Sequence, residues 1–464
     1  MIIDNIQNIL NIEYDIIIIG SGPAGISIVL NLKENNLKTL IVEAGNLEPH
    51  LDIENFLSGK VLNEQYPRLE YLRARQFGGT SSLWGGNCNL MEDTDFTNWP
   101  INKTDLDRYI KPTKKILNLK KKFYSAEIDK NIDILNLQWS DVNFLNYLNF
   151  FRDSKNHDLI LDTSFLYFNG KQGKIDSATV FNSKEYNLKS KKFVLACGGI
   201  ENSRLLEWSK KKNKNLVDNR MPIGKYFMDH PYYHVGSGVV NVEKLKFLLK
   251  EKVPELNFIL ECERSLHLSP SKNFLKFEGI GDLKLQLKFR KLSNSFKRQL
   301  ACVAPKYFQN LILKGELKDL SEVEIYVIHE QKPYIENRVE LDSLNDPYGT
   351  PKVKLNWNFP KENFLYLEKF LVEISKFFIN YNLGRLSIEN FKTKNVVLGN
   401  HQLGGTRIGI NILDSVVDKN LKVHEIKNLY ICGSSVFRTG GHAHPTFTIV
   451  QLSSRLADHL KNIN

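Results

Sequence analysis

The sequence has few cysteines and no long apolar run. Its five cysteines are odd in number, widely spaced and form no CxxC pair: Cys88, Cys197, Cys262, Cys302 and Cys432. This pattern argues against a disulfide framework and a zinc site, so we expect no metal, and it favours a reducing compartment. No apolar run approaches the ~20 residues of a membrane-spanning helix, so we expect no membrane span.

The start of the chain also lacks the marks of a targeting signal. Its first residues, MIIDNIQNILNIEYD, carry acids where a signal peptide carries positive charge, and they contain no twin arginine. We therefore expect a cytoplasmic protein.

A basic surface for nucleic acid is missing as well, although the formal net charge is +11. The basic runs, Lys120–Lys122 and Lys210–Lys212, are short and have no interleaved aromatic residues. We interpret them as solvated faces and expect no nucleic-acid partner. Weak attraction to acidic substrates or membrane surfaces is the alternative.

What the sequence does contain is a dinucleotide-binding pattern in residues 14–45, YDIIIIGSGPAGISIVLNLKENNLKTLIVEAG. A buried-type strand at 16–19 runs into Gly20-Ser21-Gly22-Pro23-Ala24-Gly25, then a helix, a second strand at 39–42 and an acid, Glu43. In such a unit the glycines allow a tight turn, close approach of a pyrophosphate and close helix–strand packing, and the acid accepts hydrogen bonds from a ribose. An ordinary αβ turn is the alternative, and the pattern alone does not separate FAD from NAD.

A second glycine-rich stretch, residues 73–91 (RARQFGGTSSLWGGNCNLM), fits neither a strand nor a helix. Its glycines and hydroxyl side chains are typical of a loop whose backbone approaches a ligand. An Ω-loop packed on Trp84 is the alternative.

Further along, the pattern predicts a return to the nucleotide-binding sheet and a second domain. We expect strands over 156–180 around a turn at Asn169-Gly170, then strand, Gly-Gly turn and helix over 192–206. Residues 232–395 predict strands at 283–289, 323–329, 338–342 and 352–357 and an amphipathic helix over 361–381. We expect His230 to satisfy a turn.

The last stretch contains two histidine segments, HQLGGTR from His401 and TGGHAHPT through His444, with a strand at 428–432 between them and a helix from about 448 to 460. At this point the chain resembles the glucose–methanol–choline (GMC) family of FAD-dependent oxidoreductases, its sugar- and polyol-acting branch in particular. The motifs that carry the resemblance are GSGPAG, GGTSSLWGG, LACGGIENSRLL, IGKYFMDHP, EQKPYIENRVELDSLNDPYGTPKVKLNW, HQLGGTRIG and GSSVFRTGGHAHPTFTI.

The resemblance implies an α/β fold: a Rossmann-like, doubly wound FAD-binding domain, discontinuous in sequence, with an inserted α+β substrate domain containing an antiparallel sheet. The segment EQKPYIENRVELDSLNDPYGTPKVKLNW would belong to that substrate-domain sheet. The expected FAD-binding parts are residues 1–100, 151–231 and 396–464. Residues 101–150 would form a substrate-domain or cap excursion, and residues 232–395 the substrate-binding domain.

The resemblance also assigns site residues. His401 and His444 match the two catalytic positions, and the cofactor, non-covalent FAD, is expected to contact Gly20, Ser21, Gly22, Pro23, Ala24, Gly25, Glu43, Ala44, Gly45, Arg75, Gly78, Gly79, Thr80, Ser81, Gly85, Gly86, Asn87, Phe165, Ser434, Ser435, Pro445 and Thr446. Non-covalent binding is expected because Leu83 stands where some sugar oxidases of the family carry the histidine that tethers FAD. Arg438 and Gly433 depart from the family's usual Pro and Asp.

The chemistry suits these residues. Oxidation of an alcohol by hydride transfer to flavin N5 needs a base for the hydroxyl proton, and a neutral imidazole is suited to that task. A second imidazole can hydrogen-bond the same oxygen. We expect His401 to be the base and His444 its partner, although the two roles could be swapped, and we expect His442 to be a loop residue.

The sequence thus predicts an FAD-dependent alcohol dehydrogenase or oxidase acting on the CH–OH group of a sugar, a polyol or a sugar-bearing metabolite. Its electron acceptor could be oxygen, a quinone or a carrier protein. The alternatives are a non-catalytic binding or carrier protein with a dinucleotide fold and an NAD(P)H-dependent flavin reductase, for which a second GxGxxG is missing.

Overall fold

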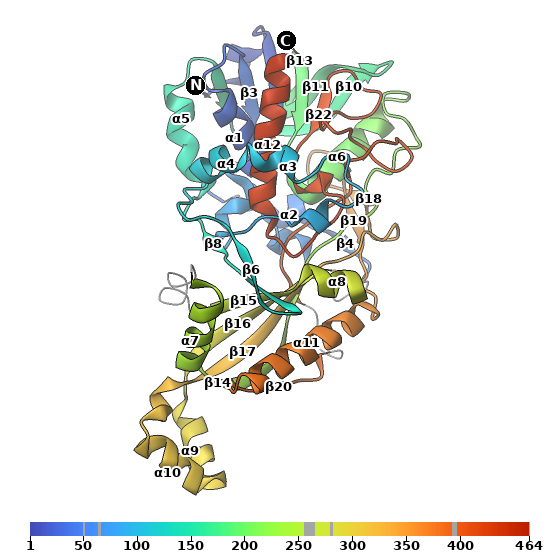
Figure 1. Cartoon of the computed structure of the whole chain (residues 1–464). Helices are drawn as coiled ribbons and strands as arrows, with labels where there is room; N and C mark the ends of the chain where they lie inside the picture. The colour runs from blue at the N-terminus through green and yellow to red at the C-terminus, as the bar shows by residue number, and fades with distance from the viewer. Residues whose placement is uncertain (50–51, 64–65, 255–264, 279–281, 392–396, 464) are drawn as a thin grey trace.

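The computed structural model describes residues 1–49, 52–63, 66–254, 265–278, 282–391 and 397–463. Figure 1 shows an upper part that contains both chain ends and a lower part built around an antiparallel sheet. Two separate clusters of buried apolar side chains correspond to these parts, one around Ile16–Ile19 and the other around Leu283, Leu285 and Leu287. Cys262 lies outside the described residues.

The upper part contains a six-stranded sheet in which all neighbouring strands are parallel. Its order is β1 (Ile2–Ile3), β9 (His157–Ile160), β3 (Thr39–Val42), β2 (Tyr14–Ile19), β13 (Ser190–Leu195) and β22 (Leu429–Ile431). Residues 16–19 of β2 are buried, as expected for a strand covered on both faces. Segments from the start, the middle and the end of the described chain thus share one sheet.

Three helices begin close to the ends of this sheet's strands. They are α1 (Pro23–Leu32), α6 (Gly198–Lys212) and α12 (Pro445–Asn462). α1 and α12 each carry proline at the first helical position, where its missing N–H costs nothing, and they pack side by side (Figure 1). The short helices α3 (Thr104–Asp107), α4 (Ile110–Ile116) and α5 (Leu148–Asp153) complete this part.

The lower part is organised by an antiparallel sheet. Its strands run in the order β20 (Gly384–Ile388), β14 (Pro231–Asn241), β17 (Leu320–His329), β16 (Leu283–Lys291), β15 (Ser265–Pro270), β7 (Ile132–Leu135) and β6 (Ser125–Asp129), with β21 (Val397–Leu398) beside β14. The long helix α11 (Asn363–Asn380) buries Phe364, Phe370 and Phe377 in the same core. Strands from residues 125–135 therefore join the sheet of the expected second domain.

The remaining strands form smaller sheets. β18 (Arg338–Asn345) and β19 (Pro351–Asn356) form a hairpin that pairs with β4 (Gly59–Val61). A second group consists of β10 (Ser164–Lys171), β11 (Lys174–Asn182) and β12 (Lys184–Leu188), and β5 (Asn87–Cys88) pairs with β8 (Gln138–Trp139). The other helices are α2 (Ile53–Leu57), α7 (Val242–Lys252), α8 (Lys272–Glu278) and the pair α9 (Asn294–Val303) and α10 (Pro305–Leu313).

Two expectations about local structure are wrong. Asn169 and Gly170 lie inside β10, and the hairpin turns instead at Gln172-Gly173, where both residues adopt positive φ. β18 and β19 do not join the large antiparallel sheet. They pair with each other, and β19 also pairs with β4. The strand–turn–helix at 192–206 and the helix α11 were placed correctly.

Candidate active site

A cavity of about 690 Å³ opens at the ends of β2 and β3 and at the starts of α1, α6 and α12. Its wall brings together the first glycine turn, the second glycine-rich loop, the start of β10 and both histidine segments. Ligands of open α/β sheets bind at this edge, beyond the carboxyl ends of the strands.

The glycine turn forms one wall because its backbone has no room for side chains. Gly20 has φ +101°, and a Cβ there would lie 2.7 Å from the Ala196 carbonyl oxygen. A Cβ at Gly25 would lie 2.1 Å from the Gly20 oxygen, so this glycine lets α1 pack against the turn. Gly22 is different: among the described residues, no atom lies within 4 Å of a Cβ placed there. Protein packing does not require glycine at position 22, whereas a ligand lying on the turn would.

Glu43 directly follows β3, and its carboxylate contacts the same glycine turn. One carboxylate oxygen accepts hydrogen bonds from the Ser21 backbone N–H at 2.9 Å and the Ser21 hydroxyl at 2.6 Å, and the other accepts from the Gly45 N–H at 2.8 Å. Burial raises the pKa of Glu43, and these hydrogen bonds act against that rise. The carboxylate thus lies on the wall of the cavity, next to the helix N-terminus.

Arg75 adds a cation to this wall. One of its terminal nitrogens, Nη2, donates to the Ser164 hydroxyl at 2.6 Å, and the guanidinium lies 3.9 Å above the ring centre of Phe56. The other terminal nitrogen, Nη1, is buried and has no hydrogen-bond partner in the part of the chain that the structure describes. A buried donor without a partner is costly, so an acceptor supplied by a ligand would satisfy this group.

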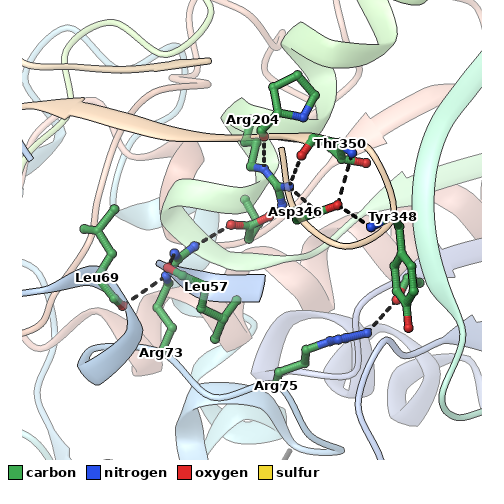
Figure 2. Close-up of polar contacts among 11 residues, drawn as sticks. Leu57, Leu69, Arg73, Arg75, Arg204, Asp346, Tyr348 and Thr350 are labelled. Carbon is green, nitrogen blue, oxygen red and sulfur yellow. Dashed lines mark hydrogen bonds and ion pairs between the residues drawn. The ribbon is translucent and has the colours of Figure 1, made fainter. Parts of the chain in front are cut away.

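A chain of buried charges encloses this end of the cavity (Figure 2). Arg73 and Arg204 both pair with Glu201, and Arg204 also pairs with Asp346 at the tip of the β18–β19 hairpin. Asp346 holds the tip closed by accepting from the backbone N–H groups of Tyr348 and Thr350, at 2.9 and 3.0 Å. Burial alone would raise the pKa of Glu201, but its two arginines hold it below the usual value.

Asp346 and Tyr348 line the cavity, and the Tyr348 ring stacks on Phe181 at a centroid distance of 4.2 Å. The sequence analysis missed Arg204, Asp346 and Tyr348. The polar residues at the tip, Asn345-Asp346-Pro347-Tyr348-Gly349, signal a turn but say nothing about where the turn lies.

His401 and His444 meet on the cavity wall. Their ring centres lie 5.1 Å apart with the planes nearly perpendicular, at 79°. His444 is the residue before α12, and His401 follows β21. Burial, together with the charge of Lys284, lowers the pKa of His401 to about 3 and that of His444 well below its usual value. Both imidazoles are therefore neutral at physiological pH.

His401 is held by Asp229 and His230. Its backbone N–H donates to the Asp229 carboxylate at 2.8 Å, and its Nδ1 lies 2.8 Å from Nδ1 of His230. Asp229 also accepts from the His230 N–H and from the Tyr66 hydroxyl. His230 therefore contacts His401 directly, whereas the sequence analysis expected it to satisfy a turn.

His444 is held by Asn89 and Lys284. Its backbone N–H donates to the Asn89 side-chain oxygen at 2.9 Å, and its Nδ1 lies 3.3 Å from Nζ of Lys284. Lys284 is fully buried on β16, and burial lowers its pKa to about 7, although Asp282 acts in the opposite direction. The sequence analysis missed this lysine because LKLQLKF looks like a strand with alternating solvated lysines.

The other expected site residues fall into two groups. Those on the cavity wall are Gly20, Ser21, Gly22, Pro23, Ala24, Glu43, Ala44, Arg75, Gly79, Thr80, Ser81, Gly85, Gly86, Asn87, Phe165, Ser434, Pro445 and Thr446. Those that do not line it are Gly25, Gly45, Gly78 and Ser435. The Ser435 hydroxyl instead accepts hydrogen bonds from the side chains of Asn202 and Thr406. A Cβ at Gly45 would clash with the Arg75 backbone. His442 pairs with Asp282, away from the cavity wall.

These features fit a dinucleotide cofactor. Gly22 leaves space over a helix N-terminus whose N–H groups can bind phosphate. Arg75 has a free donor for an anion, and Glu43 can accept from a ribose. The residues present therefore suit a group with a pyrophosphate, a ribose and a ring system that reaches the histidines.

Comparison with known proteins supports the resemblance. Residues 333–453 match the model of the family described as GMC oxidoreductase. The chain is 26% identical over 301 residues to 2-methyl-1,2-propanediol dehydrogenase of Mycolicibacterium austroafricanum, covering 62% of this chain and 52% of that protein. It is 25% identical over 303 residues to the fructose dehydrogenase large subunit of Gluconobacter japonicus, covering 61% of this chain and 49% of that one. The matches span about half the length of these relatives.

Solved structures show the same fold. Formate oxidase from Aspergillus oryzae, studied for FAD modification, aligns with a TM-score of 0.58 at 15% identity, covering 97% of this chain and 98% of that one. Pyridoxine 4-oxidase from Mesorbium loti aligns with a TM-score of 0.61 at 14% identity, covering 96% and 99%. The predicted fold class is therefore confirmed. Among the described residues, no helix is both long enough and apolar enough to cross a bilayer.

Proposed function

From the match of residues 333–453 to the GMC oxidoreductase family, we propose that the chain is an FAD-dependent enzyme that oxidises a CH–OH group. The observation that carries the proposal is the pair His401 and His444, which meet on the wall of a cavity built for a dinucleotide. The named relatives, a diol dehydrogenase and a fructose dehydrogenase subunit, support a diol, polyol or sugar as the substrate class.

The expected cofactor-binding residues would contact different parts of the cofactor along the cavity. The turn Gly20–Gly25 and the N-terminus of α1 would hold the pyrophosphate, Glu43 a ribose, and Arg75 an anionic oxygen. Ser434, Pro445 and Thr446 would hold the end near the histidines. Bound FAD would supply the acceptor for the hydride. We propose a non-covalent complex, because Leu83 offers no nucleophile at the expected tethering position.

His401 is the proposed base. Burial keeps its ring neutral, so a nitrogen lone pair is available to take the hydroxyl proton. Its Nδ1 is occupied by His230, which leaves Nε2 for the substrate. The proton stays on an imidazole that Asp229 holds in position through the backbone of His401.

His444 is the proposed hydrogen-bond donor to the same substrate oxygen. Nδ1 of His444 lies 3.3 Å from the Lys284 amine and 3.2 Å from the Asn89 side-chain oxygen; a charged Lys284 amine can only donate, so while Lys284 is charged we assign Nδ1 as its acceptor. The ring proton of His444 is then on Nε2, where it can stabilise negative charge on the substrate oxygen. Lys284 is thus a positioning residue that gives the two histidines different roles.

The first experiment is an absorption spectrum of the purified protein before and after heat denaturation. We expect flavin bands and release of free FAD from the denatured chain. Anaerobic addition of diols, polyols and sugars should then bleach the flavin. Chromophore that stays on the precipitated chain would contradict the non-covalent complex, and a colourless protein that takes up no added FAD would favour a binding protein without catalysis.

A second anaerobic experiment tests the other alternative. Bleaching within seconds by NADPH, without any alcohol, would favour a flavin reductase. The electron acceptor is identified in parallel by adding oxygen, a soluble quinone or a one-electron carrier protein to the substrate-reduced enzyme and measuring the rate of flavin reoxidation.

A further inference from the structure

Helices α9 and α10 form a projection whose residues belong to neither of the two buried apolar clusters. Residues 291–315, called here the helical hairpin, connect the end of β16 to the turn before β17 and extend away from the sheet (Figure 1). α9 and α10 pack on each other, and α10 also packs on the turn Glu316–Asp319. Within α9 no residue is buried, and within α10 only Leu311 is.

Large apolar side chains lie exposed on this projection. Val303 is 85% exposed and Leu313 82%, and Tyr307 and Ile312 are more than half exposed. Val303 and Tyr307 flank the connection between the two helices at Ala304-Pro305. Such residues carry a cost in water unless something covers them.

The charge of the helical hairpin has one sign. Residues 291–315 contain five basic residues, Lys291, Lys297, Arg298, Lys306 and Lys314, and no acidic residue. Leu313 is seven positions after Lys306, so at 100° per residue both point to the same side of α10. Lys306 and Lys314 are exposed beside it. Apolar and basic side chains therefore share the exposed surface.

We propose that the helical hairpin docks on an anionic lipid surface. A short amphipathic element with basic and apolar side chains on one exposed surface lies in the plane of a membrane, with its apolar groups below the headgroups and its lysines at the phosphates. The charge of the helical hairpin is complementary to acidic phospholipid headgroups. Its projecting shape keeps the cavity and both cores clear of the surface. This inference does not depend on the proposed chemistry.

The test measures binding of the whole protein to vesicles. Protein is co-sedimented with vesicles of phosphatidylcholine alone and of phosphatidylcholine mixed with phosphatidylglycerol. We expect binding to the anionic vesicles that weakens as salt is raised, because the attraction is partly electrostatic. Absence of binding to anionic vesicles at low salt would overturn the proposal.

Two sets of variants locate the contact. The double variant Val303→Asp, Leu313→Asp should lower the partition coefficient at least tenfold, while the matched control Phe247→Asp, an exposed apolar residue on α7, should not change it. Lys306→Gln and Lys314→Gln should each lower it roughly fivefold, since a basic residue near an anionic surface contributes ~1 kcal/mol. Equal loss in the Phe247→Asp control would overturn the assignment. Because all these side chains are exposed, melting temperatures should be unchanged.

Cys302 provides a second measurement that does not depend on sedimentation. It is exposed on α9, whereas Cys88 and Cys432 are buried and Cys197 is half-buried in the cavity wall, so it can carry an environment-sensitive fluorophore when the Cys302→Ser protein serves as the labelling control. We expect a blue shift on adding anionic vesicles, and none when Cys302→Ser protein is labelled in parallel. A shift with increasing protein concentration and no lipid, lost in the Val303→Asp, Leu313→Asp variant, would instead identify a second copy as the occupant and overturn the lipid proposal.

Discussion

The two ends of the cavity are built in different ways. At the dinucleotide end residues 20–24 line the wall with the backbone of one continuous turn. At the histidine end the side chains of His401 and His444 line the wall, and His230 and Lys284 contact them without lining the cavity; the four residues come from segments far apart in the chain. A backbone wall depends on where side chains are missing, whereas a side-chain wall depends on how four elements pack. Substitutions should therefore act on binding or folding at the first end and on reactivity at the second.

The largest expected effect is at the histidine end. His401→Ala should lower the rate of flavin reduction by substrate about a thousandfold, because general base catalysis contributes on that scale. FAD content and melting temperature should stay close to wild type, since the side chain faces the cavity. Anaerobic stopped-flow at the flavin absorption maximum measures the rate. A near wild-type rate would contradict the assignment of the base.

Gly25 and Gly22 form a matched pair at the other end. Gly25→Ala should destabilise the fold by about 3 kcal/mol, because its Cβ would lie 2.1 Å from the Gly20 oxygen. Gly22→Ala should fold normally, since nothing lies within 4 Å, but should weaken FAD binding tenfold or more. Urea unfolding and FAD titration of the apoprotein separate the two effects. Unchanged FAD affinity in Gly22→Ala would show that the cofactor does not lie on this turn.

Substitution of Lys284 tests whether the reactivity of the two histidines depends on a residue that does not line the cavity. Lys284→Met should lower the reduction rate about tenfold to a hundredfold, because His444 loses the donor that fixes its ring proton on Nε2. Wild-type rates should fall as pH rises through about 7, where Lys284 loses its proton, and the variant should lack this step. The groups around the amine are His230, His267, His401, His444 and Asp282.

Lys288→Met is the control for that variant, because Lys288 lies on the same strand but bonds the Tyr232 hydroxyl. It should change neither the rate nor the pH profile. If both variants shift the pH profile equally, the step does not belong to Lys284.

The smallest expected effect is on stability. The folded pKa of Lys284 lies near 7, below its unfolded value of about 10.4, so the unfolded chain binds more protons between these pH values. The free energy of unfolding should therefore rise with pH through this window, and the cost of the buried charge is fully present below pH 7. Lys284→Met should be more stable than wild type by about 2 kcal/mol at pH 6 and should lose this advantage toward pH 10, measured by urea unfolding.

The same contrast explains what could be predicted from the sequence. Gly20, Gly22, Gly25 and Glu43 are close in sequence and have fixed geometric tasks, so their placement followed from local pattern. The strand–turn–helix at 192–206 was predicted for the same reason. His401 and His444 were paired through the family resemblance, because nothing local relates residues 43 positions apart.

Other contacts could not be predicted from the sequence. Lys284 has the sequence context of an ordinary strand lysine, and only the tertiary fold makes it a neighbour of His444. Asp346 closes a recognisable turn, but its ion pair with Arg204 depends on the β18–β19 hairpin pairing with β4 instead of the large sheet. The turn at Gln172-Gly173 was missed because Asn169-Gly170 is the stronger turn signal and is overridden by pairing within β10 and β11.

The strand order of the parallel sheet has a consequence for synthesis of the protein. β13 lies between β2, made near the beginning, and β22, made near the end. At roughly 5–20 residues per second, the nascent chain carries the unpaired edge of β13 for tens of seconds before β22 leaves the ribosome. Thr446 and His444 follow later still, so the wall of the cavity is complete only after both glycine-rich stretches have waited for the segment that contains these two residues.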